Sequence, residues 1–165
     1  MKSILCLLLT PVLVMPLLAG CMTVKEHSSP VELRPAANSK VEDWQRTDFH
    51  VGGLDTWISP QAAITRDDIL FASEETTAGG DHTVTLEFTS HGAQSMQQLC
   101  KERMSRPVAV LVDGRIIAAP VVMTPVENRL TINFGSTKEA AREAQALEQA
   151  VNDASDPDST RTSAS

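Results

Sequence analysis

Polar and apolar residues alternate along two stretches of the chain, residues 83–89 and 130–134. Successive side chains of a β-strand point to opposite faces, so a period of two predicts a strand with one face against a core. We therefore expect a half-buried strand at each stretch. The apolar positions are Val84, Leu86, Phe88, Leu130, Ile132 and Phe134.

Residues 90–104 and 136–151 instead carry apolar side chains three and four positions apart, which predicts two helices that each pack one face on the sheet. Thr89 or Ser90 can cap the first helix. Ser136 and Glu139 have the spacing of a capping box at the start of the second. The expected buried positions are Ala93, Met96, Leu99, Cys100, Met104, Ala140, Ala144, Leu147 and Val151.

Between the two helices, Asp113-Gly114 separates two apolar runs, a pattern that predicts a β-hairpin. The turn needs positive φ, which glycine adopts freely and aspartate tolerates. Pro120 cannot donate to a ladder, so it marks a strand end, an edge or a bulge. Weaker β-rich segments precede, and residues 64–72 are expected to form a short helical turn that leads into an extended segment. The fold class predicted is α+β, a small antiparallel or mixed sheet with two helices on one face.

This domain is predicted to span residues 47–151, because the flanking segments lack a sustained apolar period. Residues 21–46 are rich in Ser, Pro, Glu, Lys and Asn, which is typical of a flexible tether. Residues 152–165 have too few apolar residues to pack and are predicted to form a disordered tail.

The first 20 residues have the pattern of a signal peptide, with Lys2 followed by an interrupted apolar run too short to span a bilayer. They end in Leu18-Ala19-Gly20-Cys21, which resembles the lipobox of bacterial lipoproteins. The resemblance implies that Cys21 is acylated and becomes the first residue of the mature protein. An ordinary secretory signal with an incidental Cys21 is the alternative, and both interpretations export the domain.

Two acyl chains are enough for stable anchoring, so the membrane is the first expected partner. Met22 follows the lipid site where an aspartate would indicate inner-membrane retention, and by analogy this favours an outer-membrane anchor facing the periplasm.

The formal net charge is −7, and it becomes −8 when the signal peptide removes Lys2. An acidic chain without a Lys/Arg cluster repels phosphate backbones, which excludes a nucleic-acid-binding role. Of the three cysteines, Cys6 leaves with the signal peptide and Cys21 carries lipid, so Cys100 has no disulfide partner. It is expected to be a small buried hydrophobe, with a reactive thiol as the alternative.

No cofactor or metal is expected, because His27, His50, His82 and His91 lack the spacing of a metal site. Asp113 is expected to form the turn with Gly114 rather than to act as a catalytic acid. An enzyme of unknown class is the minor alternative, and it would need a polar pocket with convergent titratable groups.

Three stretches together resemble the head subdomain of the first periplasmic domain of SecD, an accessory subunit of the bacterial protein-export translocon. They are Val84–Phe88, Ser90–Ala93 and Arg106–Pro120, and the later segments 130–135 and 136–141 continue the likeness. The likeness covers about residues 63–151. It implies that the domain binds protein, in a chaperone-like manner toward unfolded exported polypeptides.

Two departures limit the resemblance. No stretch after Cys21 is apolar over the length of a membrane helix, so the chain lacks the membrane motor of SecD. Residues 126–129, Val-Glu-Asn-Arg, replace a glycine pair common before the closing strand. The resemblance therefore implies a head domain separated from its motor and held by a lipid.

The apolar stretch after the hairpin turn is the candidate functional site, because a hairpin edge can receive an extended peptide by strand addition. The alternatives are that the stretch is ordinary core with Pro120 as protection against edge pairing, or that the protein is an adaptor for one folded envelope partner. The candidate residues are Ile116, Ile117, Ala118, Ala119, Pro120 and Val121.

Overall fold

The computed structural model describes residues 29–153. The predicted signal peptide, the lipid site at Cys21, the first part of the tether and residues 154–165 lie outside the described residues. The elements are β1 (Val31–Ala37), β2 (Gln45–Val51), β3 (Leu54–Ile58), β4 (Ile64–Thr65), the short 3₁₀ helix η1 (Arg66–Asp68), β5 (Ile69–Thr76), β6 (His82–Phe88), α1 (Ser90–Arg103), β7 (Val108–Val112), β8 (Arg115–Ala118), β9 (Arg129–Gly135) and α2 (Lys138–Asp153).

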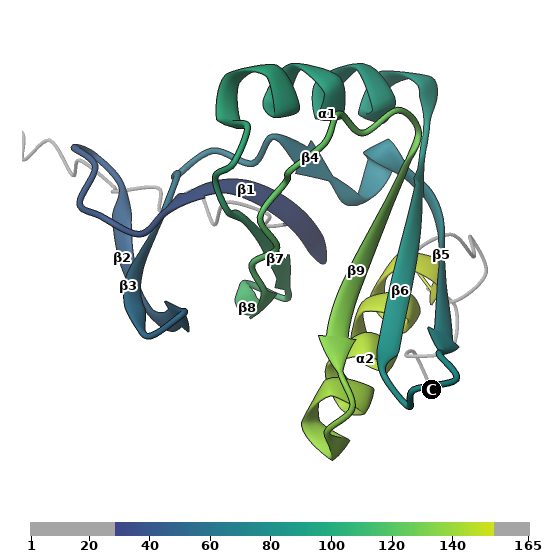
Figure 1. Cartoon of the computed structure of the whole chain (residues 1–165). Coiled ribbons are helices and arrows are strands. Elements are labelled where there is room, and N and C mark those ends of the chain that lie inside the picture. The colour runs from purple at the N-terminus through teal and green to yellow at the C-terminus, as the bar shows by residue number, and fades with distance from the viewer. Residues whose placement is uncertain (1–28, 154–165) are drawn as a thin grey trace, which may run out of the picture.

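The strands form two sheets, and the predicted α+β class is confirmed (Figure 1). The larger sheet has the order β2-β3-β1-β7-β8, with β4 also paired to β1. The smaller sheet has the order β5-β6-β9. The strand pairings within both sheets are antiparallel. Among the described residues, no helix is long and apolar enough to cross a membrane.

Both sheets and both helices contribute to the main core. The alternating apolar residues of β6 and β9 are buried, apart from the half-buried Phe134, as the period of two predicts. The predicted faces of the two helices are also buried, except that Ala93 is half-buried and Met104 lies beyond the end of α1 and is exposed. A fully buried leucine such as Leu147 contributes about 2 kcal/mol from transfer alone.

The prediction of a flexible tether over residues 21–46 was wrong for β1. This strand is central, since it pairs with β7 on one side and with β3 and β4 on the other. Val31 and Leu33 are fully buried. Pro35 is tolerated because it lies between the residues that pair with β4 and those that pair with β3, while its carbonyl accepts from the Ser59 N–H at 2.9 Å.

The start of α1 packs tightly on η1. Thr89 caps the helix by accepting from the Gly92 N–H at 3.0 Å, and its own N–H donates to the Asp68 carbonyl at 2.9 Å. A Cβ at Gly92 would lie 2.2 Å from that carbonyl oxygen, so only glycine fits there. The Asp68 carboxylate accepts from the Thr65 N–H at 2.9 Å and contacts His91 Nδ1 at 2.6 Å.

Burial is the largest single influence on Asp68 and by itself raises its pKa. The hydrogen bonds from the Thr65 backbone, His91 and the Thr65 hydroxyl together outweigh burial, so the pKa of Asp68 is lower than usual. The carboxylate is therefore held ionised at the point where η1 leads into β5.

Candidate peptide-binding edge

The predicted turn joins β7 to β8, with φ of 49° at Asp113 and 77° at Gly114. Such a two-residue turn with positive φ at both positions matches the twist of the strands that it connects. β8 is the last strand in the order of the larger sheet, so no strand of residues 29–153 pairs with its outer side. β8 is thus a free sheet edge.

Ile116 presents its backbone on this free edge. In an antiparallel hairpin closed by two residues, the pair that flanks the turn exchanges hydrogen bonds and the next pair directs its N–H and C=O groups outward. The flanking pair is Val112 with Arg115, and the next pair is Leu111 with Ile116. One donor and one acceptor are therefore available beside the hairpin turn.

The six predicted residues are adjacent but do not share one environment. Ile117 is only 2% exposed and belongs to the main core, whereas Ile116 is half-buried on the opposite face of the sheet. Ala118, Ala119 and Pro120 are half-buried, and Val121 is 42% exposed. The Pro120 carbonyl accepts from the Val108 N–H at 2.9 Å, so the segment follows β7 beyond the end of β8.

A pocket lies on each face of this edge. The first has a volume of about 480 Å³, and Gly114, Arg115 and Ile116 contribute to its wall. The second has a volume of about 320 Å³ and is lined by the segment 117–120 together with β9 residues and Glu143 of α2. Phe49 lines both pockets.

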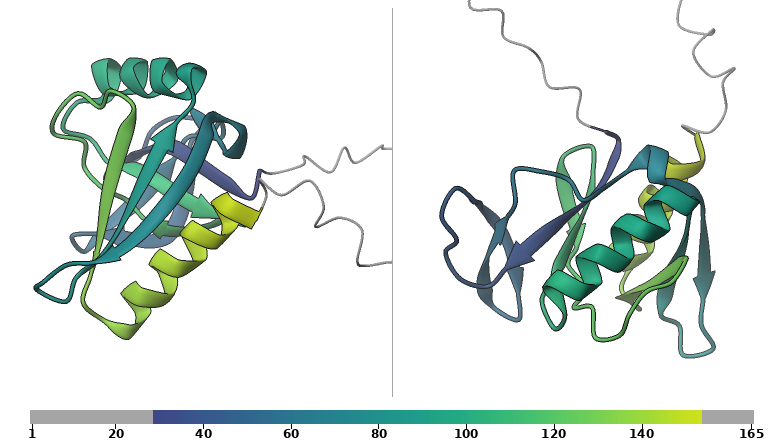
Figure 2. Two further views of the ribbon diagram at one scale, coloured as in Figure 1. Left: turned by 90° about the vertical axis from the view of Figure 1, so that its right-hand side faces the viewer. Right: turned by 90° about the horizontal axis from the view of Figure 1, so that it is seen from above.

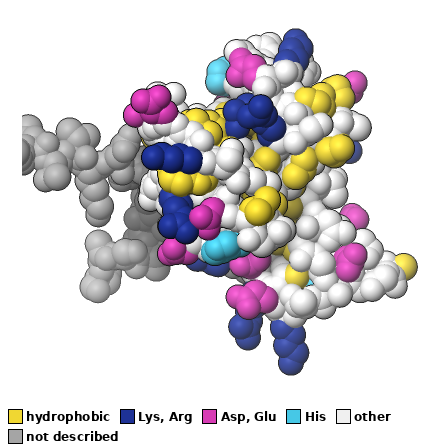
Figure 3. All heavy atoms as spheres, turned by 60° about the vertical axis from the view of Figure 1, so that its left-hand side comes forward, with side chains coloured by type: hydrophobic (Ala, Val, Ile, Leu, Met, Phe, Trp, Pro, Cys, Tyr) yellow, Lys and Arg dark blue, Asp and Glu magenta, His cyan; other side chains and the backbone are white. Residues whose placement is uncertain are grey.

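The larger sheet curls strongly around the first pocket. Residues 45–49 of β2, at one end of the strand order, and residues 114–116, at the other end, line the same cavity. Ile58, Leu111 and Ile116 line this pocket, and they belong to the second, smaller core cluster together with Ala36 and Ala109. Figure 3, which brings the side of β2 and β3 forward, shows apolar side chains interspersed with both basic and acidic ones.

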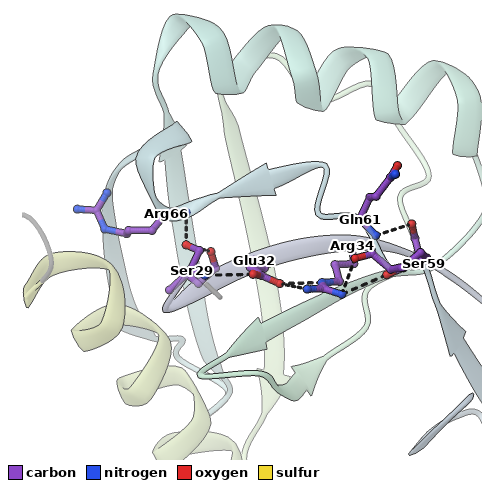
Figure 4. Close-up of polar contacts among 8 residues, drawn as sticks. Ser29, Glu32, Arg34, Ser59, Gln61 and Arg66 are labelled. Atoms are coloured by element: carbon purple, nitrogen blue, oxygen red, sulfur yellow. Dashed lines mark hydrogen bonds and ion pairs between the residues drawn. The ribbon is translucent and has the colours of Figure 1, made fainter. Parts of the chain in front are cut away.

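Each arginine that lines the first pocket is paired with a carboxylate. Arg46 pairs with Asp55 at 2.9 Å and Arg115 with Glu143 at 3.3 Å. Arg34 contacts Glu32 at 2.6 Å (Figure 4). It also donates to the Pro60 carbonyl at 3.0 Å. Since these charges are neutralised locally, the pocket is suited to main-chain and apolar groups rather than to an anion.

The outer edge of β5, unlike that of β8, is closed by side chains of α2. The Asn152 side chain accepts from the Ala72 N–H at 3.1 Å and donates to the Ala72 carbonyl at 3.0 Å, as a neighbouring strand would. Glu148 accepts from the Glu74 N–H at 3.0 Å. The predicted disordered tail was therefore wrong at Asn152, which belongs to α2 and seals this edge.

Other elements bring three residues to the candidate edge that were not predicted to belong to it, namely Phe49, Phe134 and Glu143. Phe134 was predicted as a strand residue, but no local pattern places a strand beside a given hairpin. Cys100 is buried and has no disulfide. Within residues 29–153, no three His, Cys, Asp or Glu side chains are grouped as metal ligands.

The fold is an α+β head with two antiparallel sheets, and the outer side of β8 is one of its sheet edges. The family described as SecDF, P1 head subdomain, matches residues 45–150, and the chain belongs to this family. β1 lies before the matched range although it is central to the larger sheet.

A curated relative is the protein translocase subunit SecD of Acidaminococcus fermentans, 30% identical over 63 residues, which cover 38% of this chain. The matched segment spans 15% of that relative's length. A solved structure of SecDF, described as a membrane component that enhances protein export, is similar with a TM-score of 0.51 and 20% identity over 73% of this chain and 61% of that one. SecDF in a super-membrane-facing form has a TM-score of 0.51 and 18% identity over 73% of this chain and 18% of its own. These likenesses show the fold.

Proposed function

We propose that this chain is a lipid-anchored protein of the cell envelope whose SecD-type head binds unfolded segments of exported polypeptides by strand addition to β8. The observation that carries the proposal is a free sheet edge with a pocket on each face. Binding of this kind is not catalytic, and it requires no cofactor.

The two pockets suit an added strand because alternate side chains of a strand point to opposite faces. A peptide beside β8 would place one set of side chains toward the 480 Å³ pocket and the other toward the 320 Å³ pocket. Its main chain would exchange hydrogen bonds with the outward groups of Ile116. Main-chain bonds give affinity that tolerates many sequences, which suits unfolded polypeptides.

Relationship to SecD supports a role in protein export or envelope protein handling, since the family match covers most of the described domain. The lipobox supports an anchor at Cys21 after removal of residues 1–20, with an outer-membrane location facing the periplasm favoured. A Cys21→Ser variant should stay out of the detergent phase and lose incorporation of labelled palmitate. Normal partition and processing of this variant would contradict the anchor.

The edge is tested with the purified full chain and a reduced, carboxymethylated polypeptide that stays unfolded. Ile116→Pro removes the outward N–H, whereas Ile116→Thr keeps it and serves as the matched control for lost packing. We expect binding to the unfolded polypeptide to fall about tenfold further in the proline variant than in the threonine variant, because one or two main-chain hydrogen bonds are lost.

Equal binding by the two variants would overturn strand addition. Capture of a single folded envelope protein, with no binding of unfolded chains, would identify an adaptor instead. Ile117 is unsuitable for this test, because it is a core residue and a charge there would unfold the domain.

A further inference from the structure

Two large apolar side chains, Leu70 and Phe71, are exposed next to one another at the start of β5. Their exposed fractions are 52% and 46%. The cause is a bulge, because the pairing shifts between Ile69 opposite Phe88 and Phe71 opposite Glu87. A bulge places two consecutive residues where a regular strand would place one, and so both side chains are directed away from the core.

This apolar pair lies where both ends of the described chain meet. The backbone N–H of Arg66, four residues before Leu70, donates to the Ser29 hydroxyl oxygen at 2.9 Å, and the Arg66 side chain donates to the Val151 carbonyl at 2.5 Å. Ala72, just after it, is hydrogen-bonded to Asn152. Both views of Figure 2 show the start of β1 and the end of α2 on the same side of the domain.

We infer that Leu70 and Phe71 insert into the interface of the lipid bilayer that carries the Cys21 anchor. This inference rests on the anchor in the proposed function. Eight residue steps separate Cys21 from Ser29, so an anchored chain holds Ser29 within about 29 Å of its acylated residue even when fully extended. The short reach and the position of Ser29 beside Arg66 direct this end of the domain toward the membrane.

Charge indicates which lipid surface is compatible. The chain has a net charge of −7 and Asp67, beside the pair, is exposed. Glu87, opposite Phe71, is already paired with Arg129 at 2.9 Å. The contact is therefore apolar and suits a zwitterionic surface, because anionic headgroups would repel the domain.

The pair is too small to bind a membrane alone. Burial of one half-exposed Leu or Phe side chain favours the docked state roughly fivefold. A short tether makes docking intramolecular, with an effective concentration in the millimolar range, so this modest preference is enough to orient an anchored domain.

The test uses the processed, lipidated full chain in a Cys100→Ala background, reconstituted into phosphatidylethanolamine/phosphatidylcholine vesicles with brominated acyl chains. An environment-sensitive fluorophore is placed on Leu70→Cys or, as a matched control, on Leu54→Cys. Leu54 is 54% exposed and lies in the β2–β3 hairpin (Figure 1). We expect the brominated lipid to quench the label at position 70 severalfold more than the label at position 54, and Phe71→Ser to lower the docked-to-undocked ratio about fivefold.

Vesicle flotation separates the possible failures. A chain that floats with the vesicles but is quenched equally at both positions retains its anchor and overturns the docking. A chain that does not float lacks the anchor, which overturns both the anchor and this inference but leaves the β8 edge untouched. Emission at position 70 that changes with protein density or with an added envelope protein, and not with brominated lipid, would assign the pair to a protein contact and overturn the lipid assignment.

Discussion

The outer edges of β5 and β8 present similar backbone groups, but within residues 29–153 only those of β5 are hydrogen-bonded by side chains of another element of the domain. Asn152 and Glu148 reach from α2 to satisfy Ala72 and Glu74 of β5, as another strand would. The outer side of β8 is instead bordered by two pockets. Natural sheets protect exposed edges because these pair readily with other chains. The edge of β8 is left open beside side-chain pockets whereas the edge of β5 is closed, which makes the β8 edge the better suited of these two to a partner.

The largest expected effect concerns the residue that fixes the start of the sealed edge. Gly92→Ala would place a Cβ against the Asp68 carbonyl, directly before β5, and all three close contacts there are with backbone or Cβ atoms of Asp68 that cannot rotate away. We expect a loss of about 3 kcal/mol in the free energy of unfolding, measured by urea denaturation. Gly79→Ala is the control, because its Cβ would meet only an ordinary contact at 3.7 Å. Equal stability of the two variants would show that α1 and η1 adjust freely.

Opening the sealed edge should have the next largest effect. Asn152→Ala removes both hydrogen bonds to Ala72, which should cost about 2 kcal/mol and increase hydrogen exchange at the Ala72 amide. Gln149→Ala, on the exposed side of α2, is the matched control and should change neither. If the open β5 edge then captured unfolded polypeptide as well as β8 does, the pockets would be unnecessary for binding.

The elements around these two edges differ in how far the sequence could predict them. Local periodicity predicted β6, β9, both helices and the Asp113-Gly114 hairpin, because each depends on neighbours in the chain. β1 was missed although Val31 and Leu33 alternate with polar residues, since the Ser, Pro, Glu, Lys and Asn content of residues 21–46 suggested a tether. Pro35 is acceptable only because β1 changes partner from β4 to β3 at that position, which is a property of the assembled sheet.

The candidate site was likewise predictable only where it depends on neighbours in the chain. The hairpin placed Ile116 and Pro120 near an edge, but Ile117 is part of the core, as the alternative interpretation stated. Phe49 lies far from the hairpin in sequence and reaches the site through the curl of the larger sheet. The role of Asn152 as a substitute strand required the position of α2, which no local pattern contains.

Filling one pocket should separate the contribution of side chains from that of the backbone at β8. Ala119→Phe would occupy much of the 320 Å³ pocket while the outward groups of Ile116 remain. We expect about a fivefold loss of affinity for unfolded polypeptide, measured by fluorescence anisotropy, because one set of peptide side chains loses its burial. Ala78→Phe, in the exposed β5–β6 turn, is the control. Unchanged affinity in the Ala119 variant would mean that the peptide does not use this face.

The smallest effect should be a local response of the sealed edge to acid. The folded-state pKa of Asp68 lies below its usual value of about 3.8, so in this range the unfolded chain binds more protons than the folded one. The stability from Asp68 is therefore complete above the unfolded-state pKa and is lost as the pH falls through the folded-state pKa. After correction for the pH dependence of intrinsic exchange, the protection of amides in β5, which begins at the next residue, should fall below about pH 4 more than the protection of amides in β7. Asp68→Asn should remove this difference, and a difference that persists in the variant would assign the acid response to another carboxylate.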